Sequence, residues 1–175
     1  MIFRETSLQG SYLIELEEIR DERGFFARSF CTREFLDQGI EFTPVQANLS
    51  LNEQSHTLRG MHYQDPPHEE AKLVRCIRGA IFDVIIDLRK DSPTSGQWVG
   101  VELTDKNRKS IYIPKGFAHG FLTLEPHTEV SYLMSDHHVP GKGCGIRWND
   151  PFYNIQWPAE AAVISDKDRN WPLVT

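Results

Sequence analysis

The stretch YIPKGFAHGF, residues 112–121, places a proline, a glycine and a histidine in the spacing P-x-G-x-x-H. The run SIYIP (110–114) precedes this turn, and the run GFLTLE (120–125) follows it. Short runs of β-branched and aromatic residues bounded by Gly and Pro are typical of strands. We therefore expect two strands here, joined by a tight turn that carries Gly116 and His119.

The same alternation of strand-like runs and turn residues extends over most of the chain. The junction Gly79-Ala80 predicts a hairpin, and DERGFF (21–26) predicts a turn that opens a strand. Helix is expected in CTREFLDQG (31–39), and the tail 159–175 is expected to be an irregular or helical cap. The spacing predicts a mainly β sandwich or barrel with one domain over 1–175. The other predicted extended runs are 12–19, 42–52, 57–64, 72–79, 80–89, 98–104 and 129–135.

The composition is that of a folded, acidic protein. The 175 residues are 39% hydrophobic and 11% aromatic, and the net charge is −6. An acidic chain of this kind argues against nucleic acid as the main partner. Three cysteines, Cys31, Cys76 and Cys144, form no CxxC pattern, so a reducing cytoplasm is expected. Neither a signal peptide nor an apolar run long enough to cross a membrane is visible.

The spacing of Pro114, Gly116 and His119 resembles half of the motif of the cupins, which are small double-sheet jelly rolls. In metal-binding cupins this histidine is a ligand, and a second cluster supplies H-x-H and a glutamate. The chain offers His62, but position 64 is Gln64. Since a metal site normally needs three or more suitable ligands, we expect no metal.

Two charged residues interrupt predicted core strands. In AIFDVIIDLR the face with Ile81 and Ile85 also carries Asp83, and in KLVRCIRG Lys72 shares a face with Val74. A carboxylate in such a strand is costly to bury unless it is paired. Asp83 therefore either forms a structural ion pair with a neighbouring Arg or Lys, or faces a polar cavity together with Lys72.

The run LRGMHYQ (58–64) brings Arg59 and His62 close together on one strand. Histidine suits proton transfer near neutral pH, and arginine suits phosphate. Strict alternation would place the two side chains on opposite faces of the strand. If both serve one site, the strand must be irregular near Gly60 and Met61.

Several stretches, in this order, resemble the dTDP-4-dehydrorhamnose 3,5-epimerase family, and they cover about residues 20–172. This resemblance implies a cupin-type jelly roll with short helices near the N-terminus and in the C-terminal tail. It also implies a cytoplasmic isomerase without cofactor or metal, and a homodimer with exchanged strands. The stretches are DERGFFARSF, LRGMHYQ, KLVRCIRG, FDVIIDLRKDSPTSGQWVGVEL, YIPKGFAHGFLTL, IRWND and ISDKD.

The resemblance also implies a reaction. The substrate would be a nucleotide diphosphate 4-keto-6-deoxyhexose of deoxysugar biosynthesis, whose C3 and C5 protons lie beside a ketone. Epimerisation then needs a base, an acid on the other side and positive charge near the ketone oxygen. By motif, His62 is the base, Asp168 orients it, Tyr132 is the acid, and Lys72 lies near the ketone oxygen.

The remaining roles implied by the resemblance concern binding. Arg59 and Arg23 match phosphate contacts, with Arg23 supplied by the partner subunit. Gln46 and Asn48 match sugar and nucleotide contacts, and His119 matches a contact near the diphosphate or sugar. His138, Asp83 and Lys167 complete the predicted substrate-binding residues, although Lys167 by itself reads as part of a solvated charge run.

Three positions depart from the pattern of the best-known family members. Arg28 and Gly143 stand where those members have glutamates, and His138 stands where a tyrosine stacks on the nucleotide base. Histidine stacks with less area than tyrosine. These departures leave the nucleobase, the sugar and the number of inverted centres open.

Three other functions are weighed against a 3,5-epimerase. A single-centre 3- or 5-epimerase, or a ketoisomerase, is motivated by the change at His138 in SDHHVP. A non-catalytic sugar-binding cupin would be expected if the base or the acid were missing, and both are present. A metal-dependent cupin oxygenase is disfavoured by Gln64.

Overall fold

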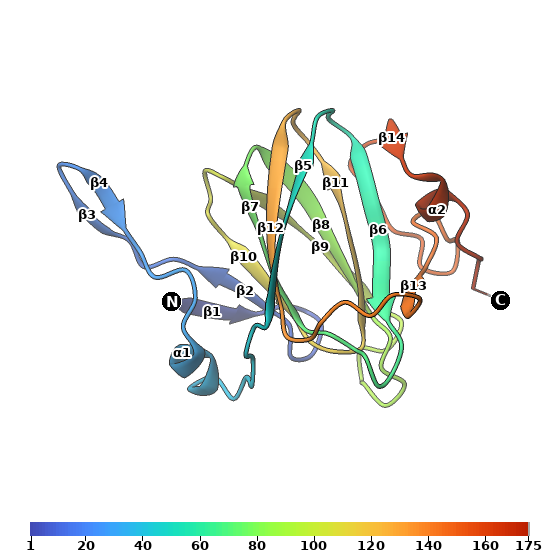
Figure 1. Ribbon diagram of the computed structural model, residues 1–175, viewed down its shortest axis with the longest axis horizontal. Helices are drawn as coiled ribbons and strands as arrows, with labels where there is room; N and C mark the ends of the chain where they lie inside the picture. The colour runs from blue at the N-terminus through green and yellow to red at the C-terminus, as the bar shows by residue number, and fades with distance from the viewer. Residues whose placement is uncertain (175) are drawn as a thin grey trace.

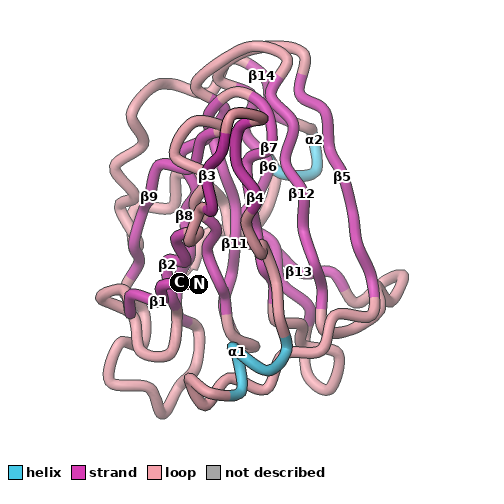
Figure 2. Tube along the Cα trace, turned by 90° about the vertical axis from the view of Figure 1, so that its left-hand side faces the viewer, coloured by secondary structure: helices cyan, strands magenta, loops and turns pink. Residues whose placement is uncertain are grey.

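The computed structural model describes residues 1–174 and is built mainly from strands (Figures 1 and 2). The strands are β1 (Ile2–Glu5), β2 (Tyr12–Glu15), β3 (Ile19–Asp21), β4 (Gly24–Phe26), β5 (Gln46–Asn52), β6 (Thr57–Gln64), β7 (Lys72–Arg78), β8 (Ala80–Asp87), β9 (Trp98–Thr104), β10 (Ser110–Ile113), β11 (Phe117–Thr123), β12 (Thr128–Met134), β13 (Gly143–Gly145) and β14 (Val163–Ile164). The helices are α1 (Thr32–Leu36) and α2 (Asp166–Arg169).

The two helices lie in the regions where helix was expected, but both are short. The predicted helix 31–39 keeps only its first half, because the chain turns after Leu36 toward Gly39, which has a φ of +74°. The predicted tail 159–175, whose last residue lies outside the described residues, contains β14 as well as α2. The predicted run 12–19 ends early, since β2 stops at Glu15.

Two antiparallel sheets form the body of the protein. The first has the order β1-β2-β10-β7-β12-β5, and the second has the order β13-β6-β11-β8-β9, with β14 added parallel to β6. Strands that follow one another in sequence repeatedly pass from one sheet to the other, as β5 to β6 and β7 to β8 do. This connectivity is that of a double-sheet jelly roll, so the predicted fold class is confirmed.

The hairpin predicted at Gly79-Ala80 is wrong. β7 pairs with β10 and β12, whereas β8 pairs with β9 and β11. Gly79 has a φ of +77°, and an added Cβ would lie 2.5 Å from Oγ1 of Thr128. The glycine therefore marks a sharp corner where the chain crosses between sheets, and a local turn signal does not distinguish this corner from a hairpin.

The core lies between the two sheets. Buried side chains from β7 and β10 meet buried side chains from β8 and β11, as Val74 and Ile111 do with Ile85 and Phe121. The alternation predicted for β8 is confirmed, because Ile81 and Ile85 belong to this inner cluster while Val84 and Ile86 belong to an outer one.

Part of the outer face of each sheet is also covered. Phe35 of α1 packs with Phe42 and Tyr112 against the first sheet. Ile146 and Ile155 cover the second sheet beside Val84 and Ile86. Burial on both faces explains why β8 and β11 read as nearly continuous apolar runs.

β6 is irregular at the position predicted from its sequence. Gly60 has a φ of +131°, the Gly60–Met61 peptide bond is cis, and the β6–β11 register shifts between His119 and Phe121. A Cβ on Gly60 would lie only 2.5 Å from Cα of Gly120. Met61 is fully buried while Arg59 and His62 both reach one cavity, so the expected irregularity is confirmed.

A separate hairpin of β3 and β4 extends away from the sandwich (Figure 1). Its apolar side chains are left in water, since Ile19 is 71% exposed and Phe26 is 73% exposed. Arg23 lies in its turn and forms an ion pair with Asp21. We call residues 19–26 the arm; an exposed apolar surface of this kind is typical of an interaction site.

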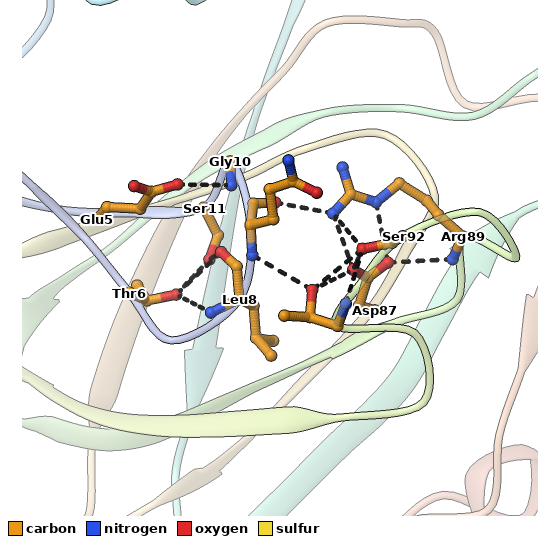
Figure 3. Close-up of polar contacts among 10 residues, drawn as sticks. Glu5, Thr6, Leu8, Gly10, Ser11, Asp87, Arg89 and Ser92 are labelled. Atoms are coloured by element: carbon orange, nitrogen blue, oxygen red, sulfur yellow. Dashed lines mark hydrogen bonds and ion pairs between the residues drawn. The ribbon is translucent and has the colours of Figure 1, made fainter.

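A buried polar cluster ties the N-terminal loop to the end of β8. Figure 3 shows the carboxylate of Asp87 accepting hydrogen bonds from Arg89 and Ser92, and Thr94 donates a further one at 2.7 Å. Arg89 also donates to the carbonyl oxygen of Gln9. Burial pushes the pKa of Asp87 upward, but these donors outweigh it and hold the pKa well below its ordinary value.

Within residues 1–174, none of the helices has the length and apolar character needed to cross a membrane.

Candidate active site

A cavity of about 540 Å³ opens between the two sheets, beside the C-terminal segment. Strands of both sheets contribute to its wall, together with β14 and α2, which lie against β6 (Figure 1). Eight of the residues predicted from the sequence line it: Asn48, Arg59, His62, Lys72, His119, Tyr132, Lys167 and Asp168.

His62 and Asp168 form a hydrogen-bonded pair on one wall of the cavity. Nε2 of His62 lies 2.5 Å from Oδ1 of Asp168, and the other carboxylate oxygen accepts the N–H of Gly60. The His62 side chain is 42% exposed, whereas that of Asp168 is 5% exposed. A proton on Nε2 directed at the carboxylate leaves the lone pair of Nδ1 free to act as a base.

The electrostatics of Asp168 favour its charged form. Burial raises the pKa of this carboxyl, but the hydrogen bond and charge of His62 and the N–H of Gly60 outweigh burial and lower it. Ser165 caps α2 by accepting the N–H of Asp168, which fixes the backbone that carries the carboxylate. The pair is therefore set to stabilise a positive charge on His62.

Tyr132 reaches the cavity from the other sheet. It lies on β12, and its hydroxyl is 2.8 Å from Oγ of Ser50 on β5. Burial raises the pKa of Tyr132, although the Ser50 hydrogen bond and the charge of Arg59 oppose this. The phenol is thus protonated at neutral pH, as a proton donor must be.

Lys72 is buried at the cavity wall with a carboxylate beside it. Its Nζ lies 3.1 Å from Oε1 of Glu70 and donates to the carbonyl oxygen of His62 at 3.4 Å. Glu70 is 8% exposed, and its Oε2 has no hydrogen-bond partner among the described residues. Lys72 therefore extends from the first sheet and brings positive charge close to the histidine on the second.

Arg59 is held by the edge strand β5. Its Nε donates to Oδ1 of Asn52 at 2.7 Å, and Nη2 donates to the carbonyl oxygen of Leu51 at 3.4 Å. Asn52 is itself fixed by a bond to the carbonyl oxygen of Thr128. No carboxylate pairs with Arg59 among residues 1–174, so the guanidinium is available to an anion.

His119 lies within β11, not in a turn before the strand as expected, and it is across from His62 with a buried carboxylate behind it. Its Nε2 is 2.8 Å from Oδ2 of Asp83, and the Asp83 side chain is fully buried. Burial raises the pKa of Asp83, while His119 and Lys72 oppose the shift. Neither interpretation of Asp83 is right as predicted, because its hydrogen-bonded partner is a histidine rather than an Arg or Lys, and Asp83 does not itself line the cavity.

Four predicted residues lie outside the cavity wall. Asp83 is behind His119, as just described, and Gln46 contacts the cavity through Asn48, to which it donates at 3.0 Å. His138 is an exposed loop residue whose N–H donates to Gln46. Arg23 is in the arm and contacts Asp21 within this chain.

Lys167 stands at the rim with the C-terminal segment. Its Nζ lies 5.3 Å from the centre of the Trp171 ring, and the Trp171 carbonyl oxygen accepts a bond from Arg147. The ring covers Gly145, where a Cβ would lie 2.1 Å from it. This packing holds α2, and with it Asp168, against β6.

Gln64, which stands where metal-binding cupins have the second histidine of the H-x-H cluster, has a structural role. Gln64 donates to the carbonyl oxygen of His68 and accepts the N–H of Val139, so it anchors the loop that carries His138. Among residues 1–174 no group of three or more His, Cys, Asp or Glu side chains is arranged to hold a metal ion.

The departures Arg28 and Gly143 lie away from the base and the acid. Arg28 pairs with Glu34 at 2.6 Å, next to the arm, and Glu34 also binds the N-terminal ammonium group. Gly143 begins β13 opposite Gln64. The charge of Arg28 is therefore neutralised within the chain.

Sequence reasoning missed Ser50 and Glu70. Ser50 lies two positions after Asn48 on the inward face of β5, and Glu70 precedes Lys72 by two positions. The two-residue spacing could have placed each beside a predicted site residue. Short polar residues on an edge strand are common, however, and nothing else in the sequence marks these two.

Together, these residues form a base and an acid on opposite walls of one cavity, which Lys72 and Arg59 also line. His62 comes from the second sheet and Tyr132 from the first. Such an arrangement suits removal of a proton from carbon on one face and its return on the other. Lys72 and Arg59 add the positive charge that an enolate and a phosphate require.

Comparisons with known proteins agree with this geometry. A family model described as dTDP-4-dehydrorhamnose 3,5-epimerase matches residues 5–175. The dTDP-4-dehydrorhamnose 3,5-epimerase of Methanothermobacter thermautotrophicus is 47% identical over 173 residues, which are 97% of this chain and 92% of that protein.

Solved structures give the same result. The dTDP-4-dehydrorhamnose 3,5-epimerase of Bacillus anthracis, crystallised with TDP and pyrophosphate, is 41% identical with a TM-score of 0.95 and 99% of each chain covered. A dTDP-6-deoxy-D-glucose-3,5-epimerase from Legionella pneumophila, in complex with dTDP-4-keto-L-rhamnose, is 39% identical with a TM-score of 0.92, covering 98% of this chain and 92% of that one. This chain is therefore a member of the dTDP-4-dehydrorhamnose 3,5-epimerase family.

Proposed function

We propose that this protein is a dTDP-4-dehydrorhamnose 3,5-epimerase, which inverts C3 and C5 of a dTDP-linked 4-keto-6-deoxyhexose in deoxysugar biosynthesis. The observation that carries the proposal is the placement of His62 and Tyr132 on opposite sheets around one cavity, with Lys72 beside His62. Inversion requires this separation, because a single group on one face would return the proton to the side from which it came.

The proposed reaction uses side chains of the protein alone. His62 removes the proton from the carbon beside the ketone, and the C–H electron pair moves into an enolate. Asp168 stabilises the imidazolium that forms, by the logic of the carboxylate behind a triad histidine. Lys72 stabilises the enolate oxygen, and Tyr132 gives its proton to the opposite face of the carbon. A second round at the other carbon completes the double inversion.

Binding of the diphosphate and nucleotide is assigned to the remaining residues. Arg59 and Lys167 supply charge for phosphate oxygens, and His119 contacts the diphosphate or the sugar. Asn48, steadied by Gln46, contacts the sugar or nucleotide. His138 is proposed to stack on the base. Asp83 is better described as a positioning residue that holds His119 than as a direct contact.

The protein is further proposed to act as a homodimer with exchanged strands. Support comes from the arm, whose apolar residues are exposed and whose Arg23 lies outside the cavity of its own chain. An arm that reaches the partner's cavity would bury Phe26 and bring Arg23 to the diphosphate. One epimerase domain per chain and a cytoplasmic location complete the proposal, supported by three cysteines that form no disulfide within the described residues.

The dimeric site can be tested by complementation. Co-expressed Arg23→Ala and His62→Asn chains form mixed dimers in which one cavity has both an intact His62 and the partner's intact arginine. We expect the purified mixed dimer to regain about half of the activity of the normal dimer, while each mutant alone is weak. If Arg23 acts within its own chain, both cavities of the mixed dimer are defective and no activity returns.

The activity itself is tested by turnover of dTDP-4-keto-6-deoxyglucose in deuterated water, followed by NMR. Deuterium at both C3 and C5 with inversion at both is expected. Deuterium and inversion at one centre would indicate a single-centre epimerase, and a shifted carbonyl would indicate a ketoisomerase. The CDP, GDP and UDP counterparts, assayed in parallel, test the assignment of thymine.

A further inference from the structure

The hydroxyl of Tyr132 has one hydrogen-bond partner among residues 1–174, and this partner is Ser50. The two oxygens are 2.8 Å apart. In the β5–β12 register Tyr132 faces Asn48 and Ser50 faces Val130, so Ser50 is the diagonal neighbour of Tyr132 on the same side of the sheet. The serine is therefore placed to act on the phenol and on no other predicted catalytic group.

Ser50 does not line the cavity. Asn48 and Tyr132 belong to the wall, but Ser50 does not, so a bound sugar would meet the tyrosine rather than the serine. Ser50 is nevertheless only half-buried, and β5 is the edge strand of its sheet. The serine thus joins a phenol inside the cavity to the edge of the sheet.

The face of β5 that carries Ser50 is polar along the whole strand. Gln46, Asn48, Ser50 and Asn52 occupy alternate positions of β5, and this spacing puts them on one face. The opposite face carries Leu49 and Leu51, which are exposed apolar residues. A polar row along an edge strand can keep water beside Ser50 while the cavity is occupied.

The proposed double inversion makes a demand that this arrangement meets. When Tyr132 protonates carbon, its O–H bond breaks, a C–H bond forms, and a phenolate remains. The same tyrosine must carry a new proton before it can serve the second carbon. His62 has the complementary need, since it holds a proton that must leave to solvent.

We propose that Ser50 is a positioning residue that reloads Tyr132 between the two inversions. Its hydroxyl donates to the phenolate, passes its proton to the phenolate oxygen and takes one from water at the strand edge. Together with the proton that His62 releases to solvent, this returns both groups to their starting state. The inference rests on the proposed function, because a single-centre enzyme would not need reloading during one encounter.

The test compares Ser50→Ala with Ser50→Thr on dTDP-4-keto-6-deoxyglucose in deuterated water, with early products resolved by NMR. Ser50→Ala is expected to slow the complete conversion about 10-fold, the effect of losing one hydrogen bond to a developing charge. It should also accumulate sugar inverted at one centre. Ser50→Thr retains a hydroxyl and should restore the normal product ratio.

Ser131→Ala is the matched control. Ser131 neighbours Tyr132 on β12, and its side chain faces the other side of the sheet. It should leave both rate and product ratio unchanged. Thermal unfolding of all three variants shows whether the fold is kept.

Three results would overturn the inference. The first is a Ser50→Ala enzyme with the normal rate and product ratio. The second is an equal slowing of first deuterium uptake and of inversion in Ser50→Ala. The third is an equal loss of activity in Ser50→Ala and Ser50→Thr. Failure of the unmodified protein to convert the substrate at all would instead refute the proposed function, so the two failures are distinguishable.

Discussion

His62 lies directly opposite His119 across the β6–β11 pair, and each imidazole is hydrogen-bonded through Nε2 to a carboxylate of its own. The two pairs differ in exposure, because the His62 side chain is 42% exposed and the His119 side chain is 6% exposed. Of these two histidines, only His62 has both a supporting carboxylate and an exposed ring that can take a proton from a substrate. His119 is held in the wall by Asp83.

Replacing His62 by Asn should therefore remove the base and spare the rest of the cavity. We expect a 100- to 10,000-fold loss of deuterium uptake into the substrate, roughly the contribution of a proton-transfer group. Binding of dTDP, measured by calorimetry, should change little. His119→Asn is the comparison, and it should weaken binding while deuterium uptake continues. Normal uptake by His62→Asn would exclude this residue as the base.

Replacing Tyr132 by Phe should separate proton removal from inversion. His62 still takes the proton, but no acid stands on the opposite face, so deuterium returns to the original side. NMR should show labelled substrate of unchanged configuration, with inversion reduced on the order of 100-fold or more. Inversion at the normal rate would show that another group or water serves as the acid.

Replacing Asp87 by Asn should destabilise the fold without touching the cavity. The amide would present its own N–H groups to Arg89, Ser92 or Thr94, which are donors already. We expect a loss of about 3 kcal/mol in the free energy of unfolding, measured with urea. Asp91→Asn, an exposed change in the same loop, should cost almost nothing.

Asp87 also predicts the direction of a pH effect. Its pKa in the folded protein lies below the ordinary value of 3.8, so folding favours the charged form. This contribution is present in full well above pH 3.8 and is lost as pH falls through the folded pKa. The Asp87→Asn variant should therefore lose less stability between neutral pH and acid than the unmodified protein. An equal loss in both proteins would contradict the assignment.

Replacing Gly60 by Ala should disrupt β6 where it carries the base. The new Cβ would lie 2.5 Å from backbone Cα of Gly120, and φ is +131°. We expect roughly 2–4 kcal/mol of destabilisation and a disproportionate loss of activity. Gly96→Ala separates the two causes, because Gly96 also has positive φ, at +76°, but has open space around it. It should cost about 1 kcal/mol and leave activity unchanged.

Much of the fold could be predicted from local sequence. The run TLRGMHYQ coincides with β6, and the irregularity at Gly60 follows from the odd separation of Arg59 and His62. These features depend on alternation and on one glycine. The Gly79-Ala80 corner could not be predicted locally, because distant partners, and not the turn itself, decide which sheet a strand joins.

Residues of the candidate site could be predicted only where they belong to a recognisable sequence motif. The carboxylate of Asp168 lies 106 positions after His62, and only the packing of the C-terminal segment on β6 brings them together. Its role came from the family resemblance. The partners Ser50 and Glu70 carry no motif, and their importance is visible only in the distances to Tyr132 and Lys72.

The two-sheet architecture has a consequence for how this catalyst can fail. Base and acid lie on separate sheets, and the inner core, including Val74 and Ile85, sets the separation of the two sheets. The span that a sugar ring must bridge is thus fixed by core thickness, about 10 Å between facing sheets. A change in the size of one of these core side chains, which do not contact the substrate, would alter the distance between His62 and Tyr132. The enzyme would then exchange substrate hydrogen with solvent without inverting the configuration of the sugar.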